Sequence, residues 1–351
     1  MNDTVMMKSL ADVCDILDSQ RIPVTARDRV KGCYPYYGAN GIQDYVDKYI
    51  FDDELVLLAE DGGNFGSKES PIAYRVSGKC WVNNHAHVLK PHDNTDVDYL
   101  CYALMFYNTE GLVNGATRQK LTQSAMKKMI IPLCDLKRQQ EIVNELNAVS
   151  HLISLRQRQA EKLDELVKAR FVEMFGDPVL NTRRLPSVSG TSLFKLSNGK
   201  AVPVEKRFDS GIPAYGGNGI SWYTDEALIN TDTLVVGRVG FQSGNVHFVY
   251  GPLWITDNAM YVTWYRKELI CLRFLNQLMK RVDFSRYQDA GDLKKITQKP
   301  FMKFEYILPS MNLQMEFVNF MDSVNCEKER IQRSAALLET LKRSLMQQYF
   351  G

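Results

Sequence analysis

Several features that would assign this chain to a common functional class are missing from its sequence. No apolar run approaches the roughly 18 residues that a transmembrane helix needs, so we expect no membrane span. The seven cysteines are scattered, odd in number and free of any Cys-x-x-Cys pair, which suits a reducing compartment. The first four residues lead into no apolar stretch, so secretion is not expected. These absences predict a cytoplasmic protein.

An excess of charge of one sign is also lacking. The 43 Lys and Arg residues against 41 Asp and Glu residues give a formal net charge of +2, which by itself indicates no polyanionic partner. Basic residues nevertheless gather in two segments, 118–128 and 294–303. A solvated surface explains either segment alone equally well. Their recurrence at equivalent places in the two halves of the chain favours a functional role.

Motifs for catalysis and cofactor binding are absent too. The glycine-rich residues 62–68 place Ser before Lys, whereas a phosphate-binding P-loop has Lys before Ser or Thr. Residues 38–41 and 216–219 lack the glycine spacing of a dinucleotide site and indicate Asn-Gly turns. No Asn-Pro-Pro-aromatic or Asp-Pro-Pro-aromatic element of an adenine methyltransferase is present. We therefore predict a non-catalytic chain without a cofactor of its own.

Two histidines close together raise the question of a metal. His85 and His87 could lie on one face of a strand, but the equivalent residues of the second half are Asn258 and Met260. A third ligand is not evident. A structural histidine pair is favoured, and no metal is expected.

What the sequence does contain is a duplication. Residues 162–176 recur as residues 337–351 at a constant offset of 175, and both copies end in Phe-Gly. A Tyr-Gly-x-Asn-Gly-Ile-like stretch at 37–42 recurs at 215–220. Half of the chain is therefore one unit, present twice.

The duplication divides the chain into four segments: a mixed domain at 1–133, a helix at 134–176, a second mixed domain at 177–309 and a second helix at 310–351. Each mixed domain is predicted to be α+β, on the basis of strand-like stretches at 55–59, 72–76, 81–82, 86–89, 234–236, 246–250 and 259–265 and helical periodicity at 96–107 and 267–282.

Apolar residues recur in steps of four and three along both predicted helices, which is typical of a coiled coil. We expect the two helices to pair with each other in antiparallel orientation; the alternative is that each packs on its own mixed domain. The residues expected to pair the helices are Ile142, Leu146, Val149, Ile153, Leu163, Phe317, Met321, Val324, Ile331 and Leu338.

The order of these features, duplicated at one period, resembles the DNA specificity subunit of type I restriction-modification enzymes over the entire chain. The resemblance is carried by residues 37–42 and 215–220, Leu121-Thr122 and Ile296-Thr297, Pro132, Leu136 and Gln139, Pro309 and Gln314, and the Phe-Gly ends at 175–176 and 350–351. One departure is a two-residue shift of Pro309 relative to its helix.

The resemblance implies that each mixed domain is a target recognition domain that reads one half of a bipartite, asymmetric site in double-stranded DNA. It implies that the helices separate these domains and dock methyltransferase (modification) subunits, two in number, in a complex with restriction/translocase subunits. S-adenosylmethionine and ATP are then expected only on those partners.

Lys and Arg would contact phosphates, while Asn, Gln, Arg and Thr would read base edges. The candidate DNA contacts are Tyr37, Asn40, Arg118, Gln119, Lys120, Thr122, Asn218, Tyr223, Arg238, Lys294, Lys295 and Thr297. Two alternatives stay open: a coiled-coil scaffold or adaptor whose mixed domains bind proteins, and a stand-alone DNA-modifying enzyme, which the missing motifs disfavour.

Overall fold

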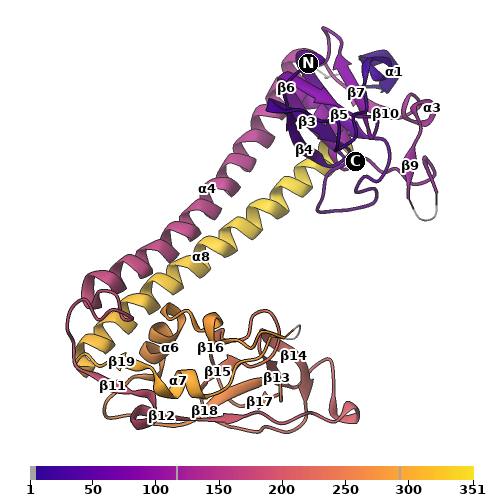
Figure 1. Cartoon of the computed structure of the whole chain (residues 1–351). Coiled ribbons are helices and arrows are strands. Elements are labelled where there is room, and N and C mark those ends of the chain that lie inside the picture. The colour runs from indigo at the N-terminus through magenta and orange to yellow at the C-terminus, as the bar shows by residue number, and fades with distance from the viewer. Residues whose placement is uncertain (1–4, 116–117, 292–293) are drawn as a thin grey trace. The chain divides into compact units, whose positions relative to one another are not determined.

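The computed structural model describes residues 5–115, 118–291 and 294–351 of the chain. Contacts between residues divide the chain into two compact units. Unit 1 comprises Met1–Gln157 and Gln332–Gly351, and unit 2 comprises Arg158–Ile331. Each unit holds one mixed region together with a stretch of both long helices, α4 (Leu136–Phe175) and α8 (Met311–Phe350) (Figure 1). Within the described ranges, no helix is sufficiently long and apolar to cross a bilayer.

A six-stranded sheet forms the centre of the mixed region of unit 1. Its order is β2 (Cys14–Ile16), β7 (Ala86–Pro91), β5 (Phe51–Ala59), β6 (Ala73–Val82), β3 (Lys31–Gly38) and β4 (Gly41–Val46). Neighbouring strands are antiparallel except β3 and β6. Side chains alternate along β5: Val56 and Leu58 join the core with helix α2 (Val97–Met105), while Leu55 and Leu57 fill the opposite face.

Short elements complete unit 1 around this sheet. They are β1 (Met6–Ser9), α1 (Leu10–Val13), η1 (Asp18–Gln20), β8 (Val113–Asn114), β9 (Lys120–Leu121), α3 (Gln123–Met126) and β10 (Ile130–Leu133). The pair β1–β10 is antiparallel and ends just before α4 begins. The first strand of the chain and the last strand of the mixed region therefore meet at the helix junction.

Unit 2 repeats this topology with its sheet divided in two. One part has the order β12 (Phe194–Asn198), β18 (Ala259–Tyr265), β15 (Thr233–Gly237) and β16 (Val246–Val249), and the other β14 (Gly219–Thr224), β13 (Ile212–Gly216) and β17 (Trp254–Ile255). Strands β16 and β17 stand where unit 1 has the single strand β6. Pro252 lies between them, and proline has no N–H to continue a ladder.

The remaining elements of unit 2 are β11 (Ser187–Ser189), α5 (Gly190–Leu193), η2 (Val204–Lys206), α6 (Leu272–Arg281), η3 (Phe284–Tyr287), α7 (Lys299–Lys303) and β19 (Glu305–Ile307). Helix α6 corresponds to α2, although the sequence predicted its start five residues earlier. The strand pair β11–β19 corresponds to β1–β10 and is also antiparallel.

A buried glutamine joins each mixed region to the long helix that follows it. Gln139 is 0% exposed; its Oε1 accepts from the Asp96 N–H at 2.8 Å, and its Nε2 donates to the carbonyls of Asn94 at 3.0 Å and Cys134 at 2.8 Å. Each of these four residues has a counterpart 175 residues later in the chain. The amide thus uses its acceptor and both donors on backbone groups.

Gln314 makes the same three bonds in unit 2. It accepts from the Cys271 N–H at 2.8 Å and donates to the carbonyls of Leu269 at 2.8 Å and Pro309 at 2.9 Å. Pro309 therefore occupies the place of Cys134, not of Pro132. The two-residue shift between the prolines leaves the junction unchanged.

The two long helices pair in antiparallel orientation, as expected. In unit 2, Asp164 accepts from Lys328 at 2.6 Å and Arg170 donates to Glu316 at 2.9 Å, so the partner on α8 moves backwards as α4 advances. In unit 1 the Tyr349 hydroxyl lies 2.5 Å from a Glu145 carboxylate oxygen. The predicted fold class, two α+β regions each followed by a long pairing helix, is confirmed.

The coiled-coil residues lie on the covered side of these helices. Those that are buried are Ile142, Leu146, Val149, Ile153, Phe317, Met321, Val324 and Ile331, and those that are half-buried are Leu163 and Leu338. Two further residues of α4, Phe171 and Phe175, are fully buried against Phe274 of α6 and Phe317. The period thus located the covered side but not this aromatic cluster.

We predict that Gln139→Leu lowers the free energy of unfolding of unit 1 by about 3 kcal/mol, because it removes three hydrogen bonds and leaves the buried Cys134 carbonyl without this partner. Denaturant unfolding monitored by hydrogen exchange of α2 and α4 measures this. Gln140→Leu is the matched control, since Gln140 is exposed one residue further along. Equal effects of the two substitutions would contradict the role of the buried amide.

Candidate nucleic-acid interface

In unit 2, the segment that follows β15 runs antiparallel to the predicted basic segment. The Ile296 N–H donates to the Arg238 carbonyl at 2.9 Å, and the Gly240 N–H donates to the Lys294 carbonyl at 2.8 Å. This pairing holds Lys294, half-buried, and Lys295, exposed, beside Arg238 at the end of the strand. Residue Thr297 follows and is exposed.

The hairpin turn of β13 and β14 lies at the same place. Gly217 packs so closely on β15 that a Cβ there would lie 3.0 Å from the Cα of Gly237. The next residue, Asn218, is exposed at the tip of the turn. We call the group Asn218, Arg238, Lys294 and Lys295 the β15 edge. Tyr223 lies outside it, half-buried in β14 and paired through its backbone with Phe208.

Unit 1 has an edge built by the same hydrogen bonds. The Leu121 N–H donates to the Glu60 carbonyl at 2.7 Å, and the Gly62 N–H donates to the Gln119 carbonyl at 3.1 Å. The Asn40 amide, in the turn of β3 and β4, donates to the Gly62 carbonyl at 3.1 Å. These bonds bring together a second group, the β5 edge, which consists of Asn40, Arg118, Gln119 and Lys120.

The other two candidates of unit 1 have local roles beside this edge. Thr122 begins α3, and its hydroxyl accepts from the Ala125 N–H at 3.3 Å. Tyr37 lies in β3 with its ring 5.7 Å from that of Tyr74. The structure thus gathers eight of the predicted contacts into two equivalent edges. Thr122 and Thr297 directly follow the basic segments of these edges, and Tyr37 and Tyr223 lie in the strands of the neighbouring hairpins.

The two edges differ in charge. On the β5 edge Lys120 pairs with Glu60 at 3.1 Å and Arg118 pairs with Asp61. The hydrogen bonds equate Glu60 with Arg238 and Asp61 with Val239, so both carboxylates are absent from the β15 edge. Among the residues that the structure describes, no ion pair involves Arg238, Lys294 or Lys295. The β5 edge is charge-compensated and the β15 edge is basic.

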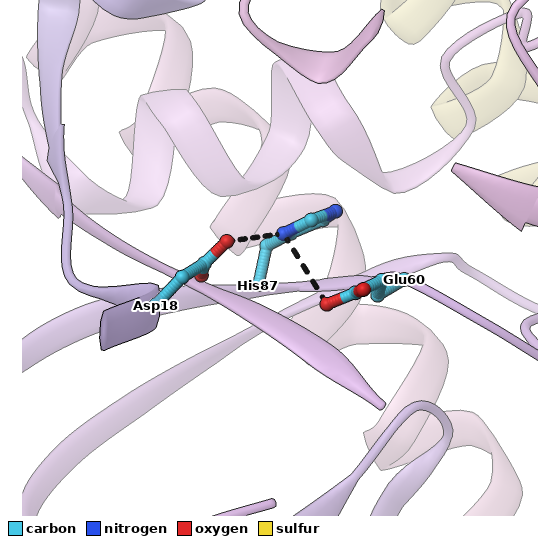
Figure 2. A group of neighbouring side chains, drawn as sticks. All are labelled: Asp18, Glu60 and His87. Atoms are coloured by element: carbon cyan, nitrogen blue, oxygen red, sulfur yellow. Dashed lines mark hydrogen bonds and ion pairs between the residues drawn. The ribbon is translucent and has the colours of Figure 1, made fainter. Parts of the chain in front are cut away.

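Behind the β5 edge, His87 lies between two carboxylates (Figure 2). Its Nδ1 is 2.7 Å from an Asp18 oxygen and 3.7 Å from a Glu60 oxygen, and its Nε2 is 2.9 Å from the Leu121 carbonyl oxygen. The ring is 0% exposed. Each ring nitrogen therefore has an oxygen within hydrogen-bond distance, one from a carboxylate and one from the backbone.

Asp18, Glu60 and His87 have ligand atoms close enough together to hold a metal ion. The surroundings argue for a different role. The Arg21 guanidinium lies 2.6 Å from Glu60 and 3.5 Å from Asp18, and Lys120 reaches the other Glu60 oxygen. Cationic side chains thus already take the places that a cation would need, and we interpret the group as a buried ion cluster.

This cluster controls the acidity of its carboxyl groups. Burial works to raise the pKa of Asp18, but the hydrogen bond and charge of His87 outweigh it and hold that pKa below its ordinary value of 3.8. Burial also works to raise the pKa of Glu60, but hydrogen bonds from Arg21 and Lys120 hold it below 4.5. Both carboxylates are therefore stabilised in the charged form.

Comparison with known proteins finds a known domain in the first part of the chain. The type I restriction modification DNA specificity domain matches residues 2–165. A relative from Haemophilus influenzae, named as a type I restriction enzyme specificity subunit, is 39% identical over 150 residues, which are 43% of this chain and 38% of the relative. The alignment thus spans well under half of the relative's length.

Solved structures share the fold across the chain. The S subunit of a type I restriction-modification system from M. genitalium has a TM-score of 0.61 at 16% identity and covers 100% of this chain and 97% of its own. A structure described under complex assembly and conformational transition of the type I R-M system has a TM-score of 0.60 at 15% identity, covering 100% and 98%. The domain match covers just under half of this chain, and the solved structures show that the chain has the fold of type I restriction-modification S subunits.

Within unit 1, the sequence analysis missed the acidic side of the β5 edge. Glu60 and Asp61 follow a buried strand and carry no motif of their own. The repeat held the signal, because the offset of 178 that relates Asn40 to Asn218 also relates Glu60 to Arg238. The charge reversal therefore lies in the repeat itself, twenty residues beyond Asn40 and Asn218.

We predict that unit 1 loses stability in acid. The folded pKa values of Asp18 and Glu60 lie below the unfolded ones, so the unfolded chain binds more protons and stability falls as pH drops below about 4.5. Above that value the contribution is complete. Hydrogen exchange of β5 and β7 from pH 7 to pH 3 measures the loss.

The matched variant is Asp18→Asn with His87→Met, which copies the equivalent residues of unit 2, Asn198 and Met260. The acid dependence of unit 1 should become shallower in it. An unchanged slope would assign the acid sensitivity to other carboxylates.

Proposed function

We propose that this chain is the DNA-reading subunit of a type I restriction-modification complex and that its two mixed regions read the two halves of a bipartite, asymmetric site in double-stranded DNA. The observation that carries the proposal is the pair of edges. Corresponding backbone hydrogen bonds place Arg118 and Lys120 in one unit, and Arg238 and Lys295 in the other, beside the turns that carry Asn40 and Asn218.

The two edges share a backbone arrangement but carry different side chains, so the two units could recognise different half-sites. Lys and Arg at each edge would hold phosphates, and the neighbouring amide and guanidinium groups would read base edges. Asn218 is the stronger candidate for reading a base, because the Asn40 amide already donates to the Gly62 carbonyl and so braces its own turn. The single amide of Asn218 would then discriminate by about 1–3 kcal/mol at one base pair.

The proposal extends to partners. Both long helices keep polar faces outside the covered residues, and these would dock two methyltransferase subunits, with restriction/translocase subunits joining the complex. S-adenosylmethionine and ATP would be bound by those partners. The purified chain should therefore transfer no methyl group until a methyltransferase subunit is added, and mapping methylated adenines in the host genome would give the site.

We predict that Lys294→Ala with Lys295→Ala weakens DNA binding by the assembled complex and lowers the salt slope of log K by about two units, one for each phosphate contact. Arg118→Ala with Lys120→Ala should lower it by less, because those cations already have carboxylate partners in the protein. Fluorescence anisotropy at several salt concentrations measures both slopes.

The control is Lys48→Ala with Lys267→Ala, which removes two exposed lysines beyond the opposite ends of β4 and β18. It should leave the salt slope nearly unchanged. If the control lowers the slope as much as the Lys294 and Lys295 variant does, the β15 edge is not the DNA-contacting surface.

A second prediction concerns the helices as a spacer. Four residues inserted in α4 near Gln159 add about 6 Å of rise and roughly one turn, so the coiled-coil register is nearly restored beyond them. The gap between the half-sites should then grow by one or two base pairs of about 3.4 Å, with the bases at each end unchanged. The methylome of the insertion strain gives the gap, and an active enzyme with an unaltered gap would exclude a spacer role.

The comparison for this insertion is Ala160→Pro, which breaks the helix. It should abolish both modification and assembly of the complex. Normal modification by the proline variant would show that continuity of α4 is not needed.

A further inference from the structure

Phe241 has the most exposed large hydrophobic side chain in the described part of the chain. It lies between β15 and β16, and 91% of it is accessible to solvent. Single exposed apolar residues are common on protein surfaces and need no function. The backbone around Phe241, its neighbours and its counterpart in unit 1 set it apart.

The backbone that carries Phe241 is held on both sides. The Ser243 N–H donates to the Gly240 carbonyl at 3.0 Å, and the Gly244 N–H donates to the Gly237 carbonyl at 2.8 Å. The Gln288 amide donates to the Ser243 carbonyl at 2.7 Å. An exposed aromatic on a backbone held in this way is preorganised, so a contact at its ring loses little conformational entropy.

The neighbours of Phe241 belong to the β15 edge. Gly240, directly before it, is bonded to Lys294, and Arg238 lies two residues further back with Asn218 beside the same strand end. The tip therefore combines cations for phosphates, a guanidinium and an amide for base edges, and one apolar ring. In the major groove the apolar feature that a ring can recognise is the 5-methyl group of thymine.

Unit 1 cannot carry such a side chain. The matching hydrogen bonds equate Gly62 with Gly240, which places Gly63 at the position of Phe241. A Cβ on Gly63 would lie 2.4 Å from the Cβ of Ala59, so the close approach excludes a larger residue. The ring is thus a property of unit 2 alone, as expected of a residue that makes the two half-sites differ.

We propose that Phe241 is a specificity-determining residue of unit 2, which packs its ring on the methyl group of one thymine in the half-site that unit 2 reads. This inference rests on the proposed DNA-reading function and adds the base type that one position recognises. The contact would supply discrimination and little of the phosphate attraction, because the ring carries no charge.

The test uses the assembled complex and duplexes in which each thymine of the mapped site is replaced in turn by deoxyuridine, which lacks only the methyl group. For the wild-type complex, one replacement should weaken binding about fourfold, the factor expected for one buried methyl-sized group. For Phe241→Ala, the thymine and deoxyuridine duplexes should bind equally, while the salt slope stays that of the wild type.

Tyr250→Ala is the control, because Tyr250 is an exposed aromatic, 64% accessible, just beyond the opposite end of β16. It should keep the fourfold discrimination. Hydrogen exchange of β15 and β16 would verify that Phe241→Ala keeps the fold, and Phe241→Leu, which retains an apolar side chain, should keep part of the discrimination.

Two results overturn the inference: no thymine replacement weakens wild-type binding, or the same replacement weakens the Phe241→Ala complex equally. A scrambled duplex in the same series separates this failure from that of the proposed function. If the wild-type complex prefers the mapped site over scrambled DNA, only the thymine contact is refuted. If it shows no preference, the DNA-reading function fails, and the inference fails with it.

Discussion

A buried amide at the start of each long helix fixes how the mixed regions are attached. Gln139 and Gln314 are both 0% exposed, and each bonds three backbone groups, of which at least one carbonyl is buried. An unpaired buried polar group costs about 1–3 kcal/mol, so any other approach of the helix is penalised. Within each unit the sheet, the helix packed on it and the long helix therefore keep one arrangement, and the strand ends that carry the candidate contacts are positioned as a consequence.

Because backbone bonds build the two edges, their side chains can differ without altering the frame. Gln123 donates to Asp18 at 3.0 Å and Gln298 donates to Asn198 at 3.4 Å, so the same contact survives the exchange of a carboxylate for an amide. His87 in its ion cluster corresponds to Met260, which is fully buried in an apolar core. One unit is thus held by charge at a place where the other is held by apolar packing.

The sequence predicted what repeats or has a period, and it could not predict what depends on long-range pairing. Steps of four and three located the covered side of α4 and α8, and alternation located the central strands. The stretches 72–76 and 81–82 proved to be one strand, β6, because Gly78 and its neighbours continue the ladder. The pairing of Lys120 with Glu60 joins residues 60 positions apart, and no local pattern announces it. Whether the edge residues contact DNA stays a prediction.

The net charge of the chain is near zero, but acidic residues neutralise the basic ones at the β5 edge and not at the β15 edge. On the β5 edge, a DNA phosphate would compete with Asp61 for Arg118 and with Glu60 for Lys120, so each new contact would be gained at the loss of an existing one. On the β15 edge, the described cations have no such competitor. In the proposed function, unit 2 would therefore supply more of the salt-dependent affinity. Unit 1 would instead depend on shape and on base contacts, so that the two half-sites differ in how they are held as well as in sequence.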